Sequence, residues 1–391
     1  MSVERIGVAG AGTMGAGIAQ VAALGGYETR LHDPQPEALE RGAQRLSEQL
    51  AKGAEKGRWS TGEAETASRR ITTAAALSEL QGCELVIEAC PEDLALKHAL
   101  FGRLAEICGP DAVLATNTSS LSVADIAQGL PHPERICGMH FFNPPALMKL
   151  VELIATGETS EEALVRAENV ARAMGREPVR CADSPGFIVN RCNRPYALES
   201  LRILDEGIAA HDQIDEVMRT DGGYRMGPFE LMDLIGIDVN LEVARSFYRQ
   251  RPVSRWQPHP IQERLVAEGR LGRKSGQGFY DYSEGVGRPD PEPLDAEVRR
   301  GILERVVAQL ANEASFAAGE GVAEPGDIDS AMRLALNHPK GPFEWVEELG
   351  ADRVVGILDD LRAATGDERY EVAPLLRGRS TSSRGPQPPG A

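Results

Sequence analysis

The sequence lacks an excess of positive charge, long apolar runs and a recognisable secretory signal peptide. Its 391 residues carry a formal net charge of −17, which argues against nucleic acid or an anionic membrane as a main partner. No apolar run approaches the roughly 20 residues that span a bilayer. The first ten residues, MSVERIGVAG, contain neither the basic region nor the cleavage site of a signal peptide. We therefore expect a cytoplasmic protein that binds neither nucleic acid nor membrane.

Closely spaced cysteine pairs of the kind that bind metals or form redox centres are also missing. None of the six cysteines has C-x-x-C spacing, so reduced and mostly buried thiols are expected rather than disulfides or a metal site. The apolar fraction of 42% and the charged fraction of 26% are ordinary for a globular enzyme, and the length allows two or three domains. The cysteines are Cys83, Cys90, Cys108, Cys137, Cys181 and Cys192.

The first motif is a glycine loop between a strand and a helix. Residues 6–9 read as a strand, residues 16–24 as a helix and residues 29–32 as a second strand that ends in Asp33. In GAGTMG, the first glycine permits a tight turn, the second lets the backbone approach a pyrophosphate, and the third lets helix and strand pack closely. An acid at the position of Asp33 accepts both ribose hydroxyls and repels a 2′-phosphate, which favours NAD over NADP. The residues of the predicted NAD loop are Gly10, Gly12, Thr13, Met14 and Gly15.

Further buried-strand patterns alternate with helices up to residue 184, which predicts a doubly wound α/β sheet of the Rossmann type. The expected strands span residues 84–90, 112–116, 136–142, 151–155 and 178–181, while residues 34–82 read as polar and helical. Lys52, Lys56 and Arg58 form a basic cluster there, which is either a solvated face or a site for the phosphates of a nucleotide-bearing substrate. Ser119 and Ser120 follow a strand end, where a serine serves either as a helix N-cap or as a site residue.

One imidazole, His140, stands at the end of a predicted strand directly before Phe-Phe-Asn-Pro-Pro. Ligands bind at the carboxyl ends of the strands in open α/β sheets. Glu152, twelve residues later, could accept the second ring N–H of His140 and raise the basicity of the imidazole. The alternative is a structural histidine with a surface glutamate.

The chain changes character after residue 184 and becomes helical. We expect a sheet domain over 1–184, a first helical copy over 185–283, a linker over 284–297, a second copy over 298–378 and a disordered tail over 379–391. The all-α part is internally duplicated: residues 197–236 match residues 311–350 without a gap, and both contain Gly-Pro-Phe-Glu. At the same offset Asn190 corresponds to Glu304, so the second copy is expected to be structural.

Six motifs together resemble the 3-hydroxyacyl-CoA dehydrogenase family over residues 4–282. They are GAGTMGAGIA, Asp33, NTSSL, GMHFFNPP, KLVE and PGFIVNR. The chain is most similar to the bacterial branch that acts on short-chain or dicarboxylic acyl-CoA in fatty acid β-oxidation. The resemblance implies an NAD-dependent dehydrogenase that interconverts L-3-hydroxyacyl-CoA and 3-ketoacyl-CoA.

The same resemblance implies a role for each matching residue. His140 is the general base, Glu152 orients it, Ser119 binds the 3-oxygen of the substrate, and Asn190 completes the substrate site. Further implied contacts are Glu92 and Lys97 near the nicotinamide ribose, Asn143 on the cofactor, and Lys56 on the coenzyme A phosphates. Arg194, one turn beyond Asn190, either reaches the far carboxylate of a dicarboxylic substrate or lies on the helix surface.

Two other functions and two assembly states stay open. The chain could be a dehydrogenase of a free sugar acid such as L-gulonate, as in the lambda-crystallin-like group, or an NAD-binding protein without catalysis. In the family a single helical domain packs against that of a partner subunit. Here the two copies could pair with each other in a monomeric pseudo-dimer, or the chain could form a homodimer.

Overall fold

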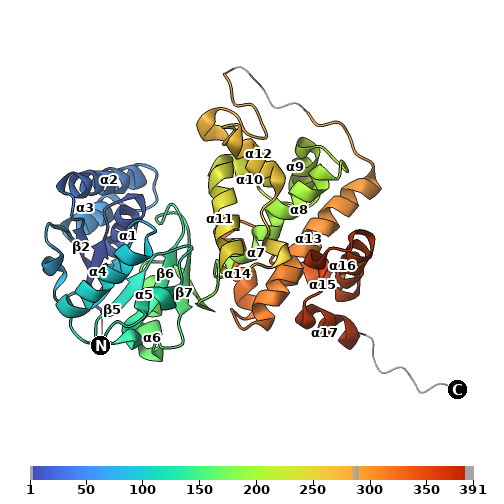
Figure 1. Cartoon of the computed structure of the whole chain (residues 1–391). Helices are drawn as coiled ribbons and strands as arrows, with labels where there is room; N and C mark the ends of the chain where they lie inside the picture. The colour runs from blue at the N-terminus through green and yellow to red at the C-terminus, as the bar shows by residue number, and fades with distance from the viewer. Residues whose placement is uncertain (1–2, 285, 287–289, 384–391) are drawn as a thin grey trace. The chain divides into compact units, whose positions relative to one another are not determined.

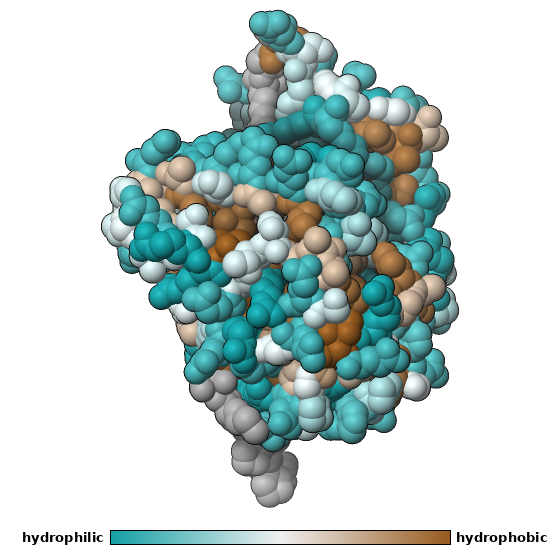
Figure 2. All heavy atoms as spheres, turned by 90° about the vertical axis from the view of Figure 1, so that its left-hand side faces the viewer, coloured by the Kyte–Doolittle hydropathy of each residue, from teal (hydrophilic) through white to brown (hydrophobic). Residues whose placement is uncertain are grey.

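The computed structural model describes residues 3–284, 286 and 290–383, and the chain divides into two compact units, residues 1–187 and 188–391. Figure 1 shows a sheet with helices in the first unit and helices alone in the second. This confirms the expected fold class. Among the described helices, none is long and apolar enough to cross a membrane. The face of the molecule in Figure 2 is mostly hydrophilic, with hydrophobic residues in separate areas.

The first unit is built on an eight-stranded sheet in the order β3-β2-β1-β4-β5-β6-β7-β8. Strands β1 to β6 are parallel to one another, β7 runs antiparallel to β6, and β8 is parallel to β7. The order reverses between β1 and β4, which is the switch point where doubly wound sheets bind their ligands. The strands are β1 (Arg5–Ala9), β2 (Glu28–His32), β3 (Ile71–Ala74), β4 (Leu85–Glu88), β5 (Val113–Thr116), β6 (Ile136–Phe141), β7 (Leu150–Ala155) and β8 (Glu177–Ala182).

Helices cover both faces of this sheet because its central strands are apolar on both sides. On one face, alternate strand residues such as Val8, Ile87 and Met139 form one core with α1, α2, α3 and α6. Helices α4 and α5 pack on the other face (Figure 1). Their bounds are α1 (Thr13–Leu24), α2 (Pro36–Glu55), α3 (Thr61–Arg69), α4 (Leu94–Ile107), α5 (Val123–Ala127) and α6 (Glu161–Ala173).

The structure corrects the sequence expectation in two segments. Residues 34–82 are not all helical, because β3 and the 3₁₀ turn η1 (Leu77–Leu80) follow α3. β3 is a short edge strand with an exposed centre, so its sequence, ITTA, has too little apolar pattern to identify it. Of the tail expected to be disordered, residues 379–383 belong to α17, and residues 384–391 lie outside the described part.

The second unit contains the same helical module twice. After the first helices of each copy, every counterpart element begins 114 residues later, as α10 (Pro228–Ile235) and α15 (Pro342–Leu349) show. The first copy comprises α7 (Val189–Cys192), α8 (Arg194–Asp205), α9 (His211–Thr220), α10, α11 (Ile237–Gln250), η3 (Ser254–Trp256) and α12 (Pro260–Ala267). The second comprises α13 (Ala296–Gly319), α14 (Pro325–Leu336), α15, α16 (Ala351–Thr365), η5 (Glu368–Tyr370) and α17 (Pro374–Ser383). Another 3₁₀ turn, η4 (Arg273–Ser275), lies between the copies.

The two copies pack against each other through α8 and α13, and η3 packs against η5. Counterpart positions meet between the two copies: the rings of Tyr224 and His338 are edge to face, with centroids 4.9 Å apart. Contact between equivalent positions is the property of a two-fold axis. The copies therefore form an internal pseudo-dimer, as the duplication in the sequence allowed.

Buried ion pairs cross this interface in both directions. Arg191 of the first copy contacts Glu313 at 2.8 Å and Glu320 at 3.0 Å. Arg305, its counterpart in the second copy, contacts Glu199 and Glu206 at 2.6 Å each. Glu199 and Glu313 are counterparts, as are Glu206 and Glu320, so one interaction is made twice. The burial of Arg191, Glu199 and Glu313 leaves at most 1% of each side chain exposed.

Candidate active site

The glycine loop after β1 has the geometry that a bound pyrophosphate requires. Gly10 has φ +113°, and a Cβ atom there would lie 2.5 Å from the oxygen of Ala89. A Cβ at Gly15 would lie 1.8 Å from the oxygen of Gly10, whereas at Gly12 it would meet no atom within 4 Å. The loop is thus closed on the protein side and open at Gly12. No side chain caps α1 and no acid lies in its first turn, so the backbone N–H groups of Thr13 and Met14 at this positive helix end suit an anion.

Asp33 stands at the carboxyl end of β2, beside this loop. Its Oδ2 accepts the N–H of Ala11 at 2.9 Å and its Oδ1 accepts the N–H of Gln35 at 3.0 Å. Both bonds hold the carboxylate at the edge where the ribose hydroxyls of a dinucleotide lie in Rossmann-type sheets. The residues of the loop and Asp33 together fit NAD.

A second polar cluster forms where β4 and β5 end. Oε1 of Glu92 accepts the hydroxyl of Thr118 at 2.7 Å and the N–H of Ser119 at 2.8 Å, and the Ser119 hydroxyl lies 3.4 Å from it. Lys97 is 1% exposed, with Nζ 2.6 Å from Glu88 and 3.2 Å from Glu92. Burial raises the pKa of Glu92, but Lys97 and the hydrogen bonds from Thr118 and Ser119 outweigh it and leave that pKa below its usual value. Glu92 is therefore an ionised anchor that fixes the backbone around Ser119.

His140 and Glu152 face each other across the antiparallel strands β6 and β7, in direct register. Nδ1 of His140 lies 2.6 Å from Oε2 of Glu152, and 7% of the His140 side chain and none of the Glu152 side chain is exposed. A carboxylate on Nδ1 fixes the tautomer with Nδ1 protonated, which leaves Nε2 as the proton acceptor. Phe142 and Phe187 flank the imidazole, with ring centroids 4.5 and 5.8 Å away. Such a pair can accept a proton at Nε2 while the buried carboxylate offsets the positive charge.

These groups share one edge of the sheet. Strands β1, β4, β5 and β6 are neighbours and parallel, so the residues that follow them meet at the same carboxyl edge. The glycine loop, Glu92, Ser119 and His140 all lie near this edge. The sheet thus brings together most of the residues that the sequence singled out.

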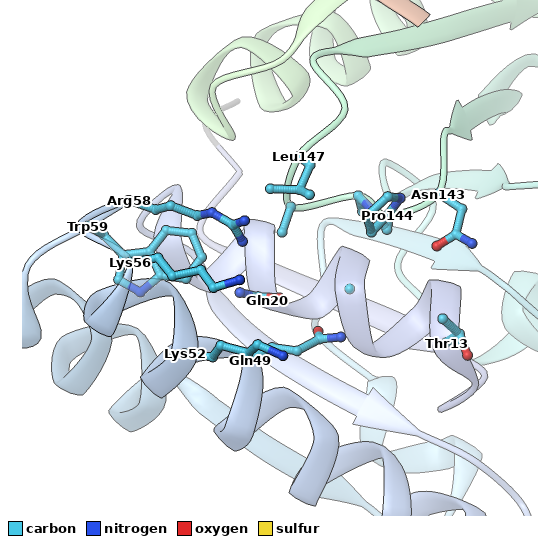
Figure 3. Close-up of a pocket in the computed structure, with 13 residues that line it drawn as sticks. Thr13, Gln20, Gln49, Lys52, Lys56, Arg58, Trp59, Asn143, Pro144 and Leu147 are labelled. Carbon is cyan, nitrogen blue, oxygen red and sulfur yellow. The ribbon is translucent and has the colours of Figure 1, made fainter. Parts of the chain in front are cut away.

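Asn143 and Lys56 line one pocket of about 260 Å³ that runs beside α1 (Figure 3). Thr13 and Asn143 are at one end, and Lys52, Lys56 and Arg58 extend into the pocket from the other. In the described part of the chain, none of these three cations has an ion-pair partner. The basic cluster therefore faces a pocket rather than open solvent alone.

Asn190 belongs to the helical unit, in α7, where it is half-buried. Its role beside His140 thus stays a proposal. Arg194 does not lie on the helix surface: it is 6% exposed, which overturns that alternative of the sequence analysis.

The sequence analysis missed Glu88 and Gln20, and it did not foresee the contact made by Asn117 of the NTSSL motif. Glu88 is fully buried and holds both Lys97 and, through Oε2, the hydroxyl of Thr116 at 2.7 Å. Asn117 accepts the N–H of Phe141 at 2.8 Å and thereby ties β5 to the strand of His140. Gln20 lines the pocket of Lys56, and both polar atoms of its amide are buried without a hydrogen-bond partner. A charged Glu in the apolar run ELVIEAC was the one available signal.

The fold and the site define an NAD-dependent dehydrogenase with a histidine–glutamate pair. Among the described residues, no group of His, Cys, Asp or Glu is arranged to hold a metal ion. All six cysteines are free, and every one except Cys90 is buried.

Comparison with known proteins shows the family. The model of the 3-hydroxyacyl-CoA dehydrogenase NAD-binding domain matches residues 5–184, and that of the C-terminal domain matches residues 186–282 and 302–387. The chain is 35% identical to the 3-hydroxyadipyl-CoA dehydrogenase of Escherichia coli over 98% of this chain and 99% of that protein. It is 43% identical to a probable 3-hydroxybutyryl-CoA dehydrogenase of Bacillus subtilis over 73% of this chain and 99% of that protein.

A solved structure supports the same relationship. The crystal structure of 3-hydroxybutyryl-CoA dehydrogenase from E. coli K12 has a TM-score of 0.93 and 34% identity, and the match covers 98% of this chain and 100% of that one. The chain belongs to the 3-hydroxyacyl-CoA dehydrogenase family. It is an oxidoreductase that uses NAD to interconvert 3-hydroxyacyl-CoA and 3-ketoacyl-CoA.

Proposed function

We propose that His140 is the general base that takes the proton of the substrate's 3-hydroxyl group, with Glu152 as its counter-charge. The observation that carries this proposal is the 2.6 Å contact between Nδ1 of His140 and Oε2 of Glu152. It leaves Nε2 without a hydrogen-bond partner among the described residues. An imidazole is well matched to proton transfer near neutral pH, and the buried carboxylate stabilises the imidazolium that forms.

Ser119 and Asn190 supply neutral hydrogen bonds to the substrate in this proposal. The nicotinamide of bound NAD supplies the hydride acceptor. The Ser119 hydroxyl is held near Glu92, and a neutral hydroxyl can position the 3-oxygen without trapping its proton. The same groups act in reverse when a 3-ketoacyl-CoA is reduced, with His140 returning the proton.

The pocket of Lys56 is the proposed site for the phosphates of coenzyme A. Lys52, Lys56 and Arg58 provide three cations within an acidic chain, and cations held close together bind a polyanion with high on-rate and affinity. Gln20 adds a buried amide without a partner at the pocket wall, which suits a ligand that both donates and accepts hydrogen bonds.

The acyl group is the finer part of the proposal. The relatives carry names for two substrates, 3-hydroxyadipyl-CoA and 3-hydroxybutyryl-CoA. Both are short 3-hydroxyacyl thioesters, and only the first has a carboxylate at the far end of its chain. We assign this chain to short 3-hydroxyacyl-CoA substrates, in preference to free sugar acids, because the pocket of Lys56 offers cations for a coenzyme A group.

The proposed assembly is a monomer with one NAD site and one substrate site. Support comes from the packing of the second helical copy on the apolar face of the first, the face through which the resemblance implies that family members pair. The ion pairs of Arg191 and Arg305 are satisfied within the chain.

A spectrophotometric assay with acetoacetyl-CoA and NADH tests the catalytic proposal. His140→Gln should lower kcat by roughly 10²- to 10⁴-fold and keep NADH affinity, because a general base contributes about that much. Glu152→Gln should also be severely impaired, since the imidazolium loses its counter-charge. His132→Gln, which changes an exposed histidine, is the control and should behave like the parent. Turnover of His140→Gln at the parent's rate would refute the assigned base.

A further inference from the structure

Arg194 at the start of α8 is a buried arginine without a carboxylate. It is 6% exposed, and its Nη1 lies 3.4 Å from both the backbone oxygen and Oδ1 of Asn240. Its Nε is buried without a hydrogen-bond partner, and the guanidinium lies 5.5 Å from the ring centre of Phe247. Among the described residues no carboxylate lies within ion-pair distance of Arg194, whereas Arg191 and Arg305 in the same unit contact two glutamates each.

The surroundings of Arg194 are polar but neutral. Asn240 is on α11, and its Oδ1 also accepts the side-chain N–H of Gln262 on α12 at 2.7 Å. Gln262 is fully buried, and its Oε1 has no hydrogen-bond partner. Burial lowers the pKa of Arg194 to about 10, and no acid opposes that effect. A buried cation that lacks an anion destabilises the folded protein, so it is expected only where a ligand supplies the anion or function requires the charge.

The second helical copy provides an internal control for this cluster. At the constant offset, each of the four residues has an apolar counterpart in the core of the second copy. The module thus folds with apolar side chains at these positions, and the fold itself does not require an arginine there. The pairs are Arg194 with Ala308, Asn240 with Val354, Phe247 with Leu361, and Gln262 with Leu376.

Arg194 also shares a helical face with Asn190. The one residue between α7 and α8, Asn193, has φ −84° and ψ −8°, so the chain stays in the right-handed helical region. Residues four apart on a helix lie on the same side. Arg194 therefore lies one turn beyond the asparagine that completes the substrate site in the proposed function.

We propose that Arg194 binds a carboxylate at the far end of the acyl chain, so that the preferred substrates are 3-hydroxyacyl-CoA thioesters of dicarboxylic acids. This inference rests on the proposed function through the role of Asn190. A guanidinium binds a carboxylate through two parallel hydrogen bonds, and Nε, which lacks an acceptor in the protein, is a donor in that fork. The carboxylate supplies the missing counter-charge. An acyl chain that ends in a methyl group leaves the guanidinium unpaired.

The test compares two substrates of equal chain length, 3-hydroxyadipyl-CoA and 3-hydroxyhexanoyl-CoA. For the parent, kcat/KM should be higher with the dicarboxylic substrate. Arg194→Met should lower this value about 100-fold for 3-hydroxyadipyl-CoA and less than about 10-fold for 3-hydroxyhexanoyl-CoA, because loss of one partner of a buried charge pair weakens binding by about that much. Arg194→Lys should recover part of the loss, since it keeps the charge without the fork.

Two controls separate recognition from structure. Arg202→Met removes another buried arginine from α8, one that is paired with Glu199, and should affect both substrates equally. The triple variant Arg194→Ala, Asn240→Val, Gln262→Leu installs the side chains of the second copy, which pack in this same module, and should lose the dicarboxylic preference. Without substrate, Arg194→Met should raise the melting temperature, because an unpaired buried charge is removed.

The outcomes are distinct for the two proposals. Equal effects of Arg194→Met on both substrates, or a parent that prefers 3-hydroxyhexanoyl-CoA, would overturn the inference and leave the proposed roles of His140 and Glu152 intact. A parent that oxidises neither substrate would overturn the proposed function itself. If the variants at Arg194 do not fold, the ratio of the parent's kcat/KM values for the two substrates still tests whether the protein prefers a terminal carboxylate.

Discussion

The two copies of the helical module share one backbone and differ in which polar groups they bury. The pairs of Arg191 with Glu313 and of Arg305 with Glu199 recur at the same offset, so they belong to the interface that both copies need. Arg194 has no polar counterpart, because the second copy has Ala308 at that position. A duplicated chain thus separates two kinds of buried charge. Buried charges that recur belong to the shared interface, and a buried charge that occurs once without a counter-charge points to a ligand.

The comparison also gives a physical reason to expect no substrate site in the second copy. Asn190 corresponds to Glu304, which pairs with Arg353 rather than remaining available to a substrate. The second copy instead supplies glutamates to Arg191 and apolar side chains to the core that both copies share. We therefore expect the second copy to contribute packing rather than catalytic groups.

Removal of the second copy should have the largest effect. A chain that ends at Tyr282 loses the partners of Arg191 and uncovers the apolar face that packs on α13. It keeps Glu199 and Glu206, which are the counterparts of Glu313 and Glu320, so two truncated chains can rebuild the interface between them. We expect the full chain to be a monomer and the truncated chain a dimer or an aggregate in light scattering.

The truncated chain has a natural precedent and a direct control. The B. subtilis relative aligns over 284 residues that make up 99% of its length. Arg191→Glu in the truncated chain should prevent dimerisation, because it would face Glu199 and Glu206 of the partner. A full-length dimer whose mass and activity are unchanged by the truncation would show that the second copy does not replace a partner subunit.

The reciprocal ion pairs predict equal losses of stability from the two copies. Burial raises the pKa of Glu199, but the guanidiniums of Arg202 and Arg305 outweigh it, so the pKa stays below its usual value and the carboxylate is charged. Glu199→Gln and Glu313→Gln should each lower the free energy of unfolding by about 3–5 kcal/mol, because each leaves a buried guanidinium short of its counter-charge.

Urea denaturation at neutral pH measures this change in the free energy of unfolding. Glu242→Gln, in an exposed pair with Arg249, is the control and should cost less than about 1 kcal/mol. A large effect in one copy and none in the other would show that the geometric symmetry has no energetic counterpart.

At neutral pH His338 should produce the smallest effect, because its contribution to stability changes only in acid. Burial lowers its pKa to about 3, well below the 6.5 of a free histidine, so the folded protein keeps it neutral. Its contribution to stability is complete above pH 6.5 and is lost as the pH falls towards 3, because the unfolded chain binds the proton first. His338→Tyr, which copies Tyr224, should abolish a dependence of about 1.4 kcal/mol per pH unit in that window. Parent and variant curves that stay parallel from pH 7 to pH 4 would contradict this.

The sequence determined the parts of the protein that depend on local geometry. The glycine loop and Asp33 could be predicted because a tight turn, a close approach and a helix start each require a residue type at a fixed spacing. The duplication was visible for a similar reason: the repeated turns and helix caps, such as Gly227-Pro228 and Gly341-Pro342, recur at one offset. The family motifs identified the same enzyme that the comparisons show.

The tertiary structure decided what depends on pairing between distant segments. His140 meets Glu152 because β7 runs antiparallel to β6 in direct register, and a shift by one residue would turn the glutamate to the other face of the sheet. Register is set by the whole core rather than by the residues around either side chain. The sequence likewise left Arg194 either at the surface or near the substrate. Only its contacts with Asn240 and Phe247 of α11 show it buried without a carboxylate, because burial is a property of the neighbours that folding brings together.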